Sequence, residues 1–146
     1  MNKEIAIASD HAGYKMKSAL IKYLEEKGFT LKDFGTGSTV SVDYPDQGHP
    51  LAKAVEEGLF NRGISLCGSG NGINMVTNKY QGIRSALCWN REIARLARRH
   101  NDANICSLPA RFVDLSLAKE IVDVFLETEF EGGRHNQRIN KIPRII

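Results

Sequence analysis

The sequence has little cysteine, and its arrangement would not hold a fold together. The three cysteines, Cys67, Cys88 and Cys106, are an odd number, and each lies within or at the end of an apolar run. None forms a Cys-x-x-Cys motif or a Cys/His pair at metal-ligand spacing. These absences argue against a disulfide scaffold and a structural metal. We therefore expect free thiols and a reducing compartment.

Long apolar runs and a strong charge of one sign are also missing. No segment is long enough to cross a bilayer, and residues 1–4 lead into a short strand without the apolar region of a signal peptide. The net charge is only +3, and basic residues cluster only at Arg95, Arg98 and Arg99 and in the tail after Arg134. We expect a cytoplasmic protein without a membrane or nucleic-acid partner.

The chain also lacks low-complexity linkers and internal repeats, so its 146 residues predict one domain, 1–146. Short apolar runs alternate with segments of helical periodicity. Strands are expected at 5–8, 29–34, 63–67, 83–88 and 103–108, and helices at 15–27, 50–57, 71–79, 90–100 and 114–128. Five strand-helix units predict an α/β fold, a parallel sheet with helices on both faces.

Residues 63–73, Gly-Ile-Ser-Leu-Cys-Gly-Ser-Gly-Asn-Gly-Ile, form the most informative segment. An apolar strand ends at Cys67 and runs into glycines at alternate positions before the next helix. Such a turn presents several backbone N–H groups on one surface, which suits a phosphate or a developing oxyanion. A thiol beside a helix N-terminus is favoured as thiolate, the form that acts as a base or nucleophile. An inert core cysteine remains the alternative.

In an open α/β sheet, ligands bind at the carboxyl ends of the strands. Asp10 and His11 follow the first expected strand, Cys67 ends the third, and Arg111 lies just beyond the fifth. His100 lies where a helix enters the fifth strand, at the opposite edge. It could reach the same crevice only from a neighbouring subunit, which predicts a site shared in a dimer.

These segments together resemble a known family. The resemblance is carried by Asp10-His11-Ala12-Gly13, Asp43-Tyr44-Pro45, Cys67-Gly68-Ser69-Gly70-Asn71-Gly72, Asn78-Lys79, Gly82-Ile83-Arg84, His100-Asn101-Asp102-Ala103-Asn104 and Glu131-Gly132-Gly133-Arg134-His135. In this order they are similar to the ribose-5-phosphate isomerase B family, whose wider membership includes galactose- and allose-6-phosphate isomerases. The resemblance implies a Rossmann-like three-layer sandwich with strand order 2-1-3-4-5. It also implies a homodimer able to pair into a tetramer, and aldose-ketose isomerisation without metal or other cofactor.

The resemblance also implies roles for individual residues. Cys67 would be the base, His100 the acid that opens the sugar ring, and Ser69 a hydroxyl that assists ring opening or proton relay. Arginine suits the phosphate because of its fork of donors. The residues expected to bind substrate are Asp10, His11, Tyr44, Gly68, Ser69, Gly70, Asn71, Gly72, Asn101, Arg111, Arg134 and Arg138, with the tail 131–146 contributing to the site or to the dimer.

Each assignment has a structural alternative. Asp10 can be a helix N-cap, and His100 can be a C-terminal helix residue stabilised by the helix dipole. Tyr44-Pro45 can be only a turn, and the tail arginines a solvated end. His49 and His135 are expected at the surface.

Departures from the family pattern bear on the substrate. Pro109 stands where relatives more usually have glycine, which makes Arg111 the weakest phosphate ligand. Ile73 stands where some relatives carry a glutamate base, so Cys67 has no rival in the turn. Galactose-6-phosphate isomerase subunits generally lack the histidine of His-Asn-Asp and the Gly-Gly-Arg-His tail, and this chain has both. Ribose 5-phosphate is therefore the expected substrate, with galactose 6-phosphate, allose 6-phosphate or a non-catalytic nucleotide-binding role as alternatives.

Overall fold

The computed structural model describes residues 2–144. Met1 and the last two residues of the predicted tail 131–146 lie outside the described residues. The strands are β1 (Glu4–Ser9), β2 (Thr30–Asp33), β3 (Arg62–Cys67), β4 (Ser85–Leu87) and β5 (Ile105–Pro109). The helices are α1 (Tyr14–Glu26), α2 (Tyr44–Glu56), α3 (Asn71–Thr77), α4 (Arg91–Asn101), α5 (Leu115–Glu127) and α6 (His135–Ile139), and the 3-10 turn η1 (His11–Gly13) precedes α1.

The five strands form one parallel sheet in the order β2-β1-β3-β5-β4. The predicted α/β fold and parallel sheet are confirmed, but the predicted order 2-1-3-4-5 is wrong at one edge, because β5 lies between β3 and β4. The burial of the two strands explains why β5, and not β4, lies next to β3. All five residues of β5 are buried, as a central strand requires, whereas the three residues of β4 are half-buried and suit an edge.

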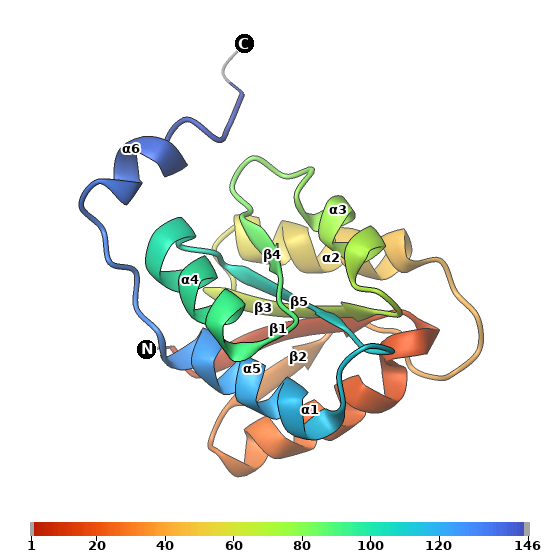
Figure 1. Ribbon diagram of the computed structural model, residues 1–146. Coiled ribbons are helices and arrows are strands. Elements are labelled where there is room, and N and C mark those ends of the chain that lie inside the picture. Colours follow the sequence, from red (N-terminus) through yellow and green to blue (C-terminus); the bar gives the residue numbers. More distant parts are fainter. Residues whose placement is uncertain (1, 145–146) are drawn as a thin grey trace.

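Helices cover both faces of the sheet, as expected (Figure 1). Alternating side chains of β1 point to opposite faces: Ile5 and Ile7 pack in the larger core under α1, α4 and α5, while Ala6 and Ala8 pack under α2. The three-layer sandwich follows from this two-sided burial.

The largest boundary difference concerns α2, which starts at Tyr44 rather than near Pro50. Tyr44-Pro45 therefore forms the first helical turn and not an isolated turn. Proline is tolerated there because the first N–H groups of a helix have no partner within the helix. Pro50 lies inside the same helix, which is why the sequence pattern placed the start too late.

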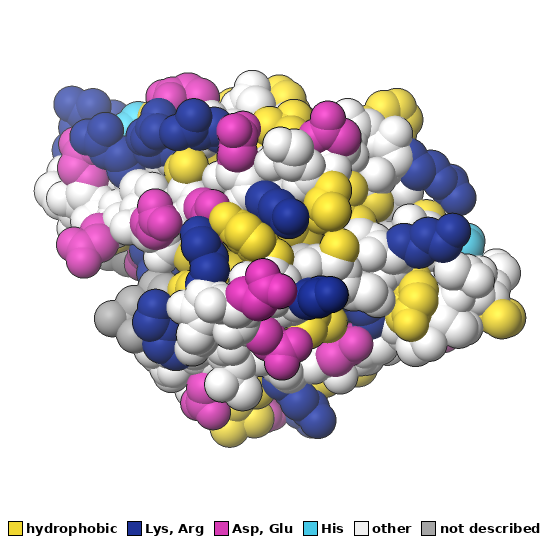
Figure 2. Space-filling view, turned by 90° about the horizontal axis from the view of Figure 1, so that it is seen from below, with side chains coloured by type: hydrophobic (Ala, Val, Ile, Leu, Met, Phe, Trp, Pro, Cys, Tyr) yellow, Lys and Arg dark blue, Asp and Glu magenta, His cyan; other side chains and the backbone are white. Residues whose placement is uncertain are grey.

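No helix in the described range combines the length and apolarity that a membrane span requires. Figure 2 shows the face that carries α1 and α5, where acidic and basic side chains lie beside one another across the middle. This mixture differs from the continuous basic stripe typical of nucleic-acid-binding surfaces.

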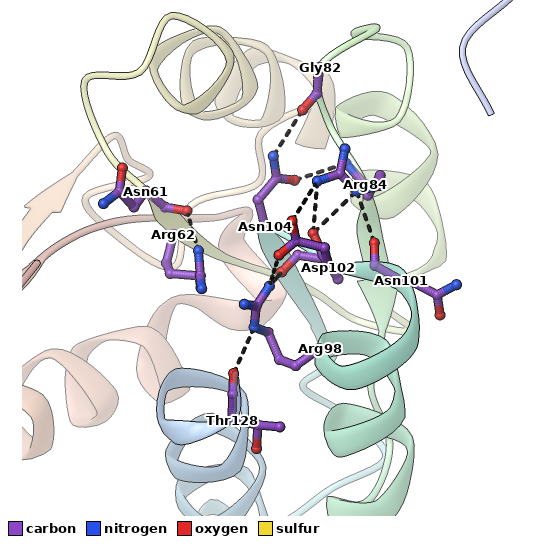
Figure 3. A network of polar contacts seen from close by, with 10 residues as sticks. Asn61, Arg62, Gly82, Arg84, Arg98, Asn101, Asp102, Asn104 and Thr128 are labelled. Atoms are coloured by element: carbon purple, nitrogen blue, oxygen red, sulfur yellow. Dashed lines mark hydrogen bonds and ion pairs between the residues drawn. The ribbon is translucent and has the colours of Figure 1, made fainter. Parts of the chain in front are cut away.

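A buried arginine fixes the end of α4 (Figure 3). The Arg98 side chain is only 2% exposed; its Nη1 donates to Asp102 Oδ1 at 2.8 Å and to the Ala103 carbonyl at 2.6 Å, and its Nε donates to the Thr128 carbonyl at 3.0 Å. Arg84 donates to the carbonyl of Asp102, which ends the helix in a left-handed conformation with φ 46°. The last turn of α4, which carries His100, is therefore tied to α5 and to the segment before β4.

Candidate active site

Cys67 is the last residue of β3 and lies at the carboxyl edge of the sheet. It alternates with Ile64 and Leu66, which face the larger core, so its side chain points to the face covered by α2 and α3. Cys67 is 5% exposed, and its carbonyl accepts a hydrogen bond from the Ala110 N–H at 3.0 Å. The thiol is therefore held by a central strand and shielded from bulk solvent. Cys88 and Cys106 are also free and buried, as expected, but they belong to the core.

The turn after Cys67 has the shape that its glycines predict. Gly70 has φ 77°, and a Cβ atom there would lie 2.5 Å from Cδ1 of Leu87 and 3.1 Å from the Leu108 carbonyl carbon. Within residues 2–144 no acceptor is bonded to the N–H groups of Gly68, Ser69 or Gly70. The turn thus offers backbone donors at the edge where Cys67 ends.

Two predicted substrate-binding side chains lie against these glycines. A Cβ at Gly68 would be 3.1 Å from Nη1 of Arg111, and one at Gly72 would be 2.5 Å from Cζ of the Tyr44 ring. The Arg111 N–H also donates to the Gly68 carbonyl at 3.0 Å, which ties the loop after β5 to the turn. The proline at position 109 therefore does not carry Arg111 away from the turn.

Asp10 and His11 follow β1 at the same edge. The Asp10 carboxylate accepts from the Gly13 N–H at 3.1 Å, so it is the N-cap that the alternative reading predicted. The His11 Nδ1 accepts from the Val42 N–H at 3.1 Å. These bonds orient both side chains and leave the second carboxylate oxygen and Nε2 for other partners. Ser69 and Asn71 are exposed in the turn, where Ser69 Oγ accepts from the Asn71 N–H at 3.2 Å.

The opposite end of the sheet, where β5 begins, holds the remaining predicted residues: His100, Asn101, Arg134 and Arg138. His100 and Asn101 end α4 before β5 begins at Ile105, whereas Cys67 pairs with Pro109 at the end of β5. Four residue steps along a parallel strand span about 13 Å. A single chain therefore does not bring the two groups together. Arg134 directly precedes α6 and Arg138 lies within it, and both side chains are exposed.

The sequence did not show that His135 lies with His100 at this end of the sheet. His135 was expected at the surface but is only 7% exposed, and its ring stacks on that of His100 with centroids 4.4 Å apart. The burial comes from packing of α6 against α4, two elements far apart in the sequence. Glu131 lies beside both rings. It begins the Glu-Gly-Gly-Arg-His segment, and the sequence indicated no role for it.

A network of three serine hydroxyl groups, two of them buried and one half-buried, was also missed. Ser65 Oγ lies 2.7 Å from Ser107 Oγ, which lies 3.1 Å from Ser85 Oγ, and Ser85 donates to Asn74 Oδ1 at 2.6 Å. Ser65 shares the sheet face of Cys67, two residues away. The only sequence signal was the alternation of small polar residues with Ile64 and Leu66 along β3. This network of hydrogen bonds links β3, β5 and β4 to Asn74 on α3.

Comparison with known proteins decides the family. The sequence profile of the family described as Ribose/Galactose Isomerase matches residues 5–142, almost the whole chain. The chain belongs to this family. The resemblance seen in the sequence motifs is thereby confirmed.

The relatives are similar over nearly their full lengths. Ribose-5-phosphate isomerase B of Escherichia coli is 42% identical over 143 residues, which cover 98% of this chain and 96% of the relative. D-erythrulose-4-phosphate isomerase of Pectobacterium atrosepticum is 41% identical, with 94% of this chain and 91% of the relative covered.

Solved structures agree with the fold. A ribose 5-phosphate isomerase of Thermotoga maritima superposes with a TM-score of 0.97 at 47% identity, covering 99% of this chain and 100% of the other. Ribose-5-phosphate isomerase B of Mycoplasma genitalium, with bound ribulose-5-phosphate, gives a TM-score of 0.91 at 41% identity, covering 95% and 93%.

Proposed function

We propose that this protein interconverts ribose 5-phosphate and ribulose 5-phosphate through an enediolate. The observation that carries the proposal is full-length similarity to isomerases of this substrate, one of them with ribulose-5-phosphate bound. The position of Cys67 beside the glycine turn at the carboxyl edge supports it, because the reaction needs a base next to donors for an oxyanion.

In the proposed mechanism, the Cys67 thiolate removes the proton from C2 of the open-chain aldose and returns it to C1. The negative charge that develops on the oxygen is held by N–H groups of the turn formed by Gly68, Ser69, Gly70, Asn71 and Gly72. The thiol forms no covalent bond with the sugar. The Ser69 hydroxyl assists ring opening or the proton relay.

The sugar chain would lie between the residues that follow β1 and the start of α2. Tyr44 lies against Gly72 of the turn, and the Asp10 N–H donates to the carbonyl of Leu66, the residue before Cys67. Asp10, His11 and Tyr44 have polar atoms that suit sugar hydroxyls. Arg111, Arg134 and Arg138 would hold the phosphate, which guanidinium groups bind through paired donors.

The site is complete only if two chains share it. His100, Asn101, Arg134 and Arg138 would come from the partner subunit of a homodimer and meet the Cys67 turn. His100 would then donate the proton that opens the furanose ring, a task that suits imidazole. Pairing of dimers into a tetramer is a further possibility of the same proposal. The free thiols suit a reducing compartment such as the cytoplasm.

The substrate is tested by initial rates on the purified protein with ribose 5-phosphate, galactose 6-phosphate, allose 6-phosphate and erythrose 4-phosphate. We expect ribose 5-phosphate to have the highest kcat/KM. Faster turnover of a six-carbon phosphate would contradict the assignment. The four-carbon sugar is the second candidate, because one full-length relative is a D-erythrulose-4-phosphate isomerase.

A further inference from the structure

Three side chains gather where α4 ends and α6 packs on it. The rings of His100 and His135 are stacked, with an interplanar angle of 14°. Glu131 faces both: its Oε2 is 4.0 Å from Nε2 of His100, and its Oε1 is 3.7 Å from Nε2 of His135. One carboxylate therefore lies beside two imidazoles that already touch each other.

Glu131 is held firmly in this position. Its N–H donates to the Arg99 carbonyl at 3.0 Å, and its Oε2 accepts from Arg99 Nη2 at 3.0 Å. Both bonds go to the residue just before His100. The carboxylate is therefore fixed to the same helical turn that carries the proposed acid.

His135 supplies the other half of the arrangement. Its Nε2 is buried and has no hydrogen-bond partner among residues 2–144, while Oε1 of Glu131 is the acceptor that it faces at 3.7 Å. A buried unpaired nitrogen is costly, and a carboxylate that moves a few tenths of an ångström would satisfy it. His135 thus packs one face of His100 and links it to Glu131.

A shared metal ion does not explain the cluster. A metal lies in the plane of each imidazole that binds it, and two stacked rings with nearly parallel planes do not meet at one such point. Proton binding fits better. Two stacked imidazolium ions repel each other, which limits the pair to one positive charge. The neighbouring carboxylate stabilises that single charge.

Other charges also act on the pair. Arg99 on α4 pairs with Glu131 and partly offsets its charge, and the exposed Arg134 and Arg138 lie just before α6 and within it. The carboxylate of Asp102, the C-cap of α4, is engaged by Arg98 and Arg84. The C-terminal end of α4 also favours a proton on His100, and Glu131 is the carboxylate that faces its ring.

We propose that Glu131 is a positioning residue for His100: with His135 as a stacked support, it fixes the ring and keeps a proton on it for opening the sugar ring. The inference rests on the proposed function, in which His100 is the ring-opening acid. Glu131 itself does not touch the sugar.

The direct test follows the imidazole signals of His100 and His135 by NMR as a function of pH in the whole protein. In Glu131→Gln, which retains an acceptor for Arg99, the midpoint of the His100 titration should move to lower pH, because the carboxylate 4.0 Å from Nε2 of His100 is lost. Glu131→Asp, which keeps the charge, should restore most of the shift. Glu129→Gln is the matched control, because it removes an exposed charge two residues away and should leave the midpoint in place.

The kinetic test compares a substrate that must be opened with one that is already open. Erythrose 4-phosphate cannot close a five-membered ring, because the required hydroxyl carries the phosphate. Glu131→Gln should lose about 3- to 10-fold in kcat/KM for ribose 5-phosphate, because the ring-opening acid is less well placed and less often protonated, and much less for erythrose 4-phosphate.

An unchanged His100 titration in Glu131→Gln would overturn the inference, as would equal losses on both substrates. Failure of the proposed function has a different signature. If His100→Ala leaves ribose 5-phosphate turnover intact, His100 is not the acid, whereas the NMR titration still decides whether Glu131 controls its proton.

Discussion

At the scale of single residues, Cys67 carries the proposed chemistry. Its strand position was predictable because an apolar run ends at Cys67 and glycines follow at once. The same reasoning separated it from Cys88 and Cys106, which lack such a turn and lie in the core. Its role as base stays a prediction.

Replacing Cys67 by alanine should lower kcat by about 10³-fold or more, because the proton between C1 and C2 then has no carrier. Stability should change by only about 1 kcal/mol, since one small buried atom is lost. Turnover and urea unfolding measure the two effects. Cys106→Ala is the control: it should cost a similar stability and keep activity. Retained turnover in Cys67→Ala would remove Cys67 as the base.

Gly70 is the residue whose backbone the turn depends on. Gly70→Ala should destabilise the protein by roughly 2–4 kcal/mol, because it adds a clash with Leu87 to the strain of φ 77°. Gly58 offers a matched control, since its φ is 80° and nothing lies within 4 Å of an added Cβ. Gly58→Ala should cost about 1 kcal/mol. If urea unfolding shows the same loss of stability for Gly70→Ala and Gly58→Ala, the contact with Leu87 does not contribute.

At the scale of elements, the sequence assigned the tail to the site or the dimer but showed neither the helix α6, at His135–Ile139, nor its docking on α4. The burial of His135 could not be predicted, because it depends on α4, more than thirty residues earlier, and α6 is too short to show an apolar period. Glu131 had no visible role for the same reason.

Docking of α6 should weaken in acid. Removal from water opposes ionisation of Glu131, but the charges of Arg99, His135 and His100 outweigh it, so the pKa of the carboxyl lies below its ordinary value of 4.5. A lowered carboxyl pKa gives stability that is present above pH 4.5 and lost as pH falls through the folded value.

This loss can be followed by the methyl signals of Ile139 on α6. They should shift as pH falls below 4.5 and through the lower folded pKa of Glu131, and the shift should be absent in Glu131→Gln. A shift of the same size in Glu131→Gln would assign the acid effect to another group.

At the scale of the whole molecule, the sequence predicted the layers better than the order of strands. Alternation and length showed five strands and helices on both faces, which is confirmed. The position of β5 between β3 and β4 was not predictable from order along the chain, because neighbouring strands are chosen by burial on both faces. The carboxyl edge was nevertheless placed correctly, since it depends only on strand direction.

The same argument from strand direction predicts that His100 and Cys67 lie at opposite ends of the sheet, and they do. How two chains meet depends on surfaces whose pairing a single sequence does not reveal. A site shared between two subunits requires that a defect at Cys67 in one chain and a defect at His100 in the other complement each other.

Complementation between two inactive variants measures whether the site is shared. Cys67→Ala and His100→Ala should each be inactive on ribose 5-phosphate alone. When the two chains are unfolded, mixed in equal amounts and refolded, half of the dimers are hybrids with one intact site each, so about a quarter of wild-type activity should return. If the refolded mixture contains hybrid dimers and no activity returns, Cys67 and His100 do not form a site between subunits.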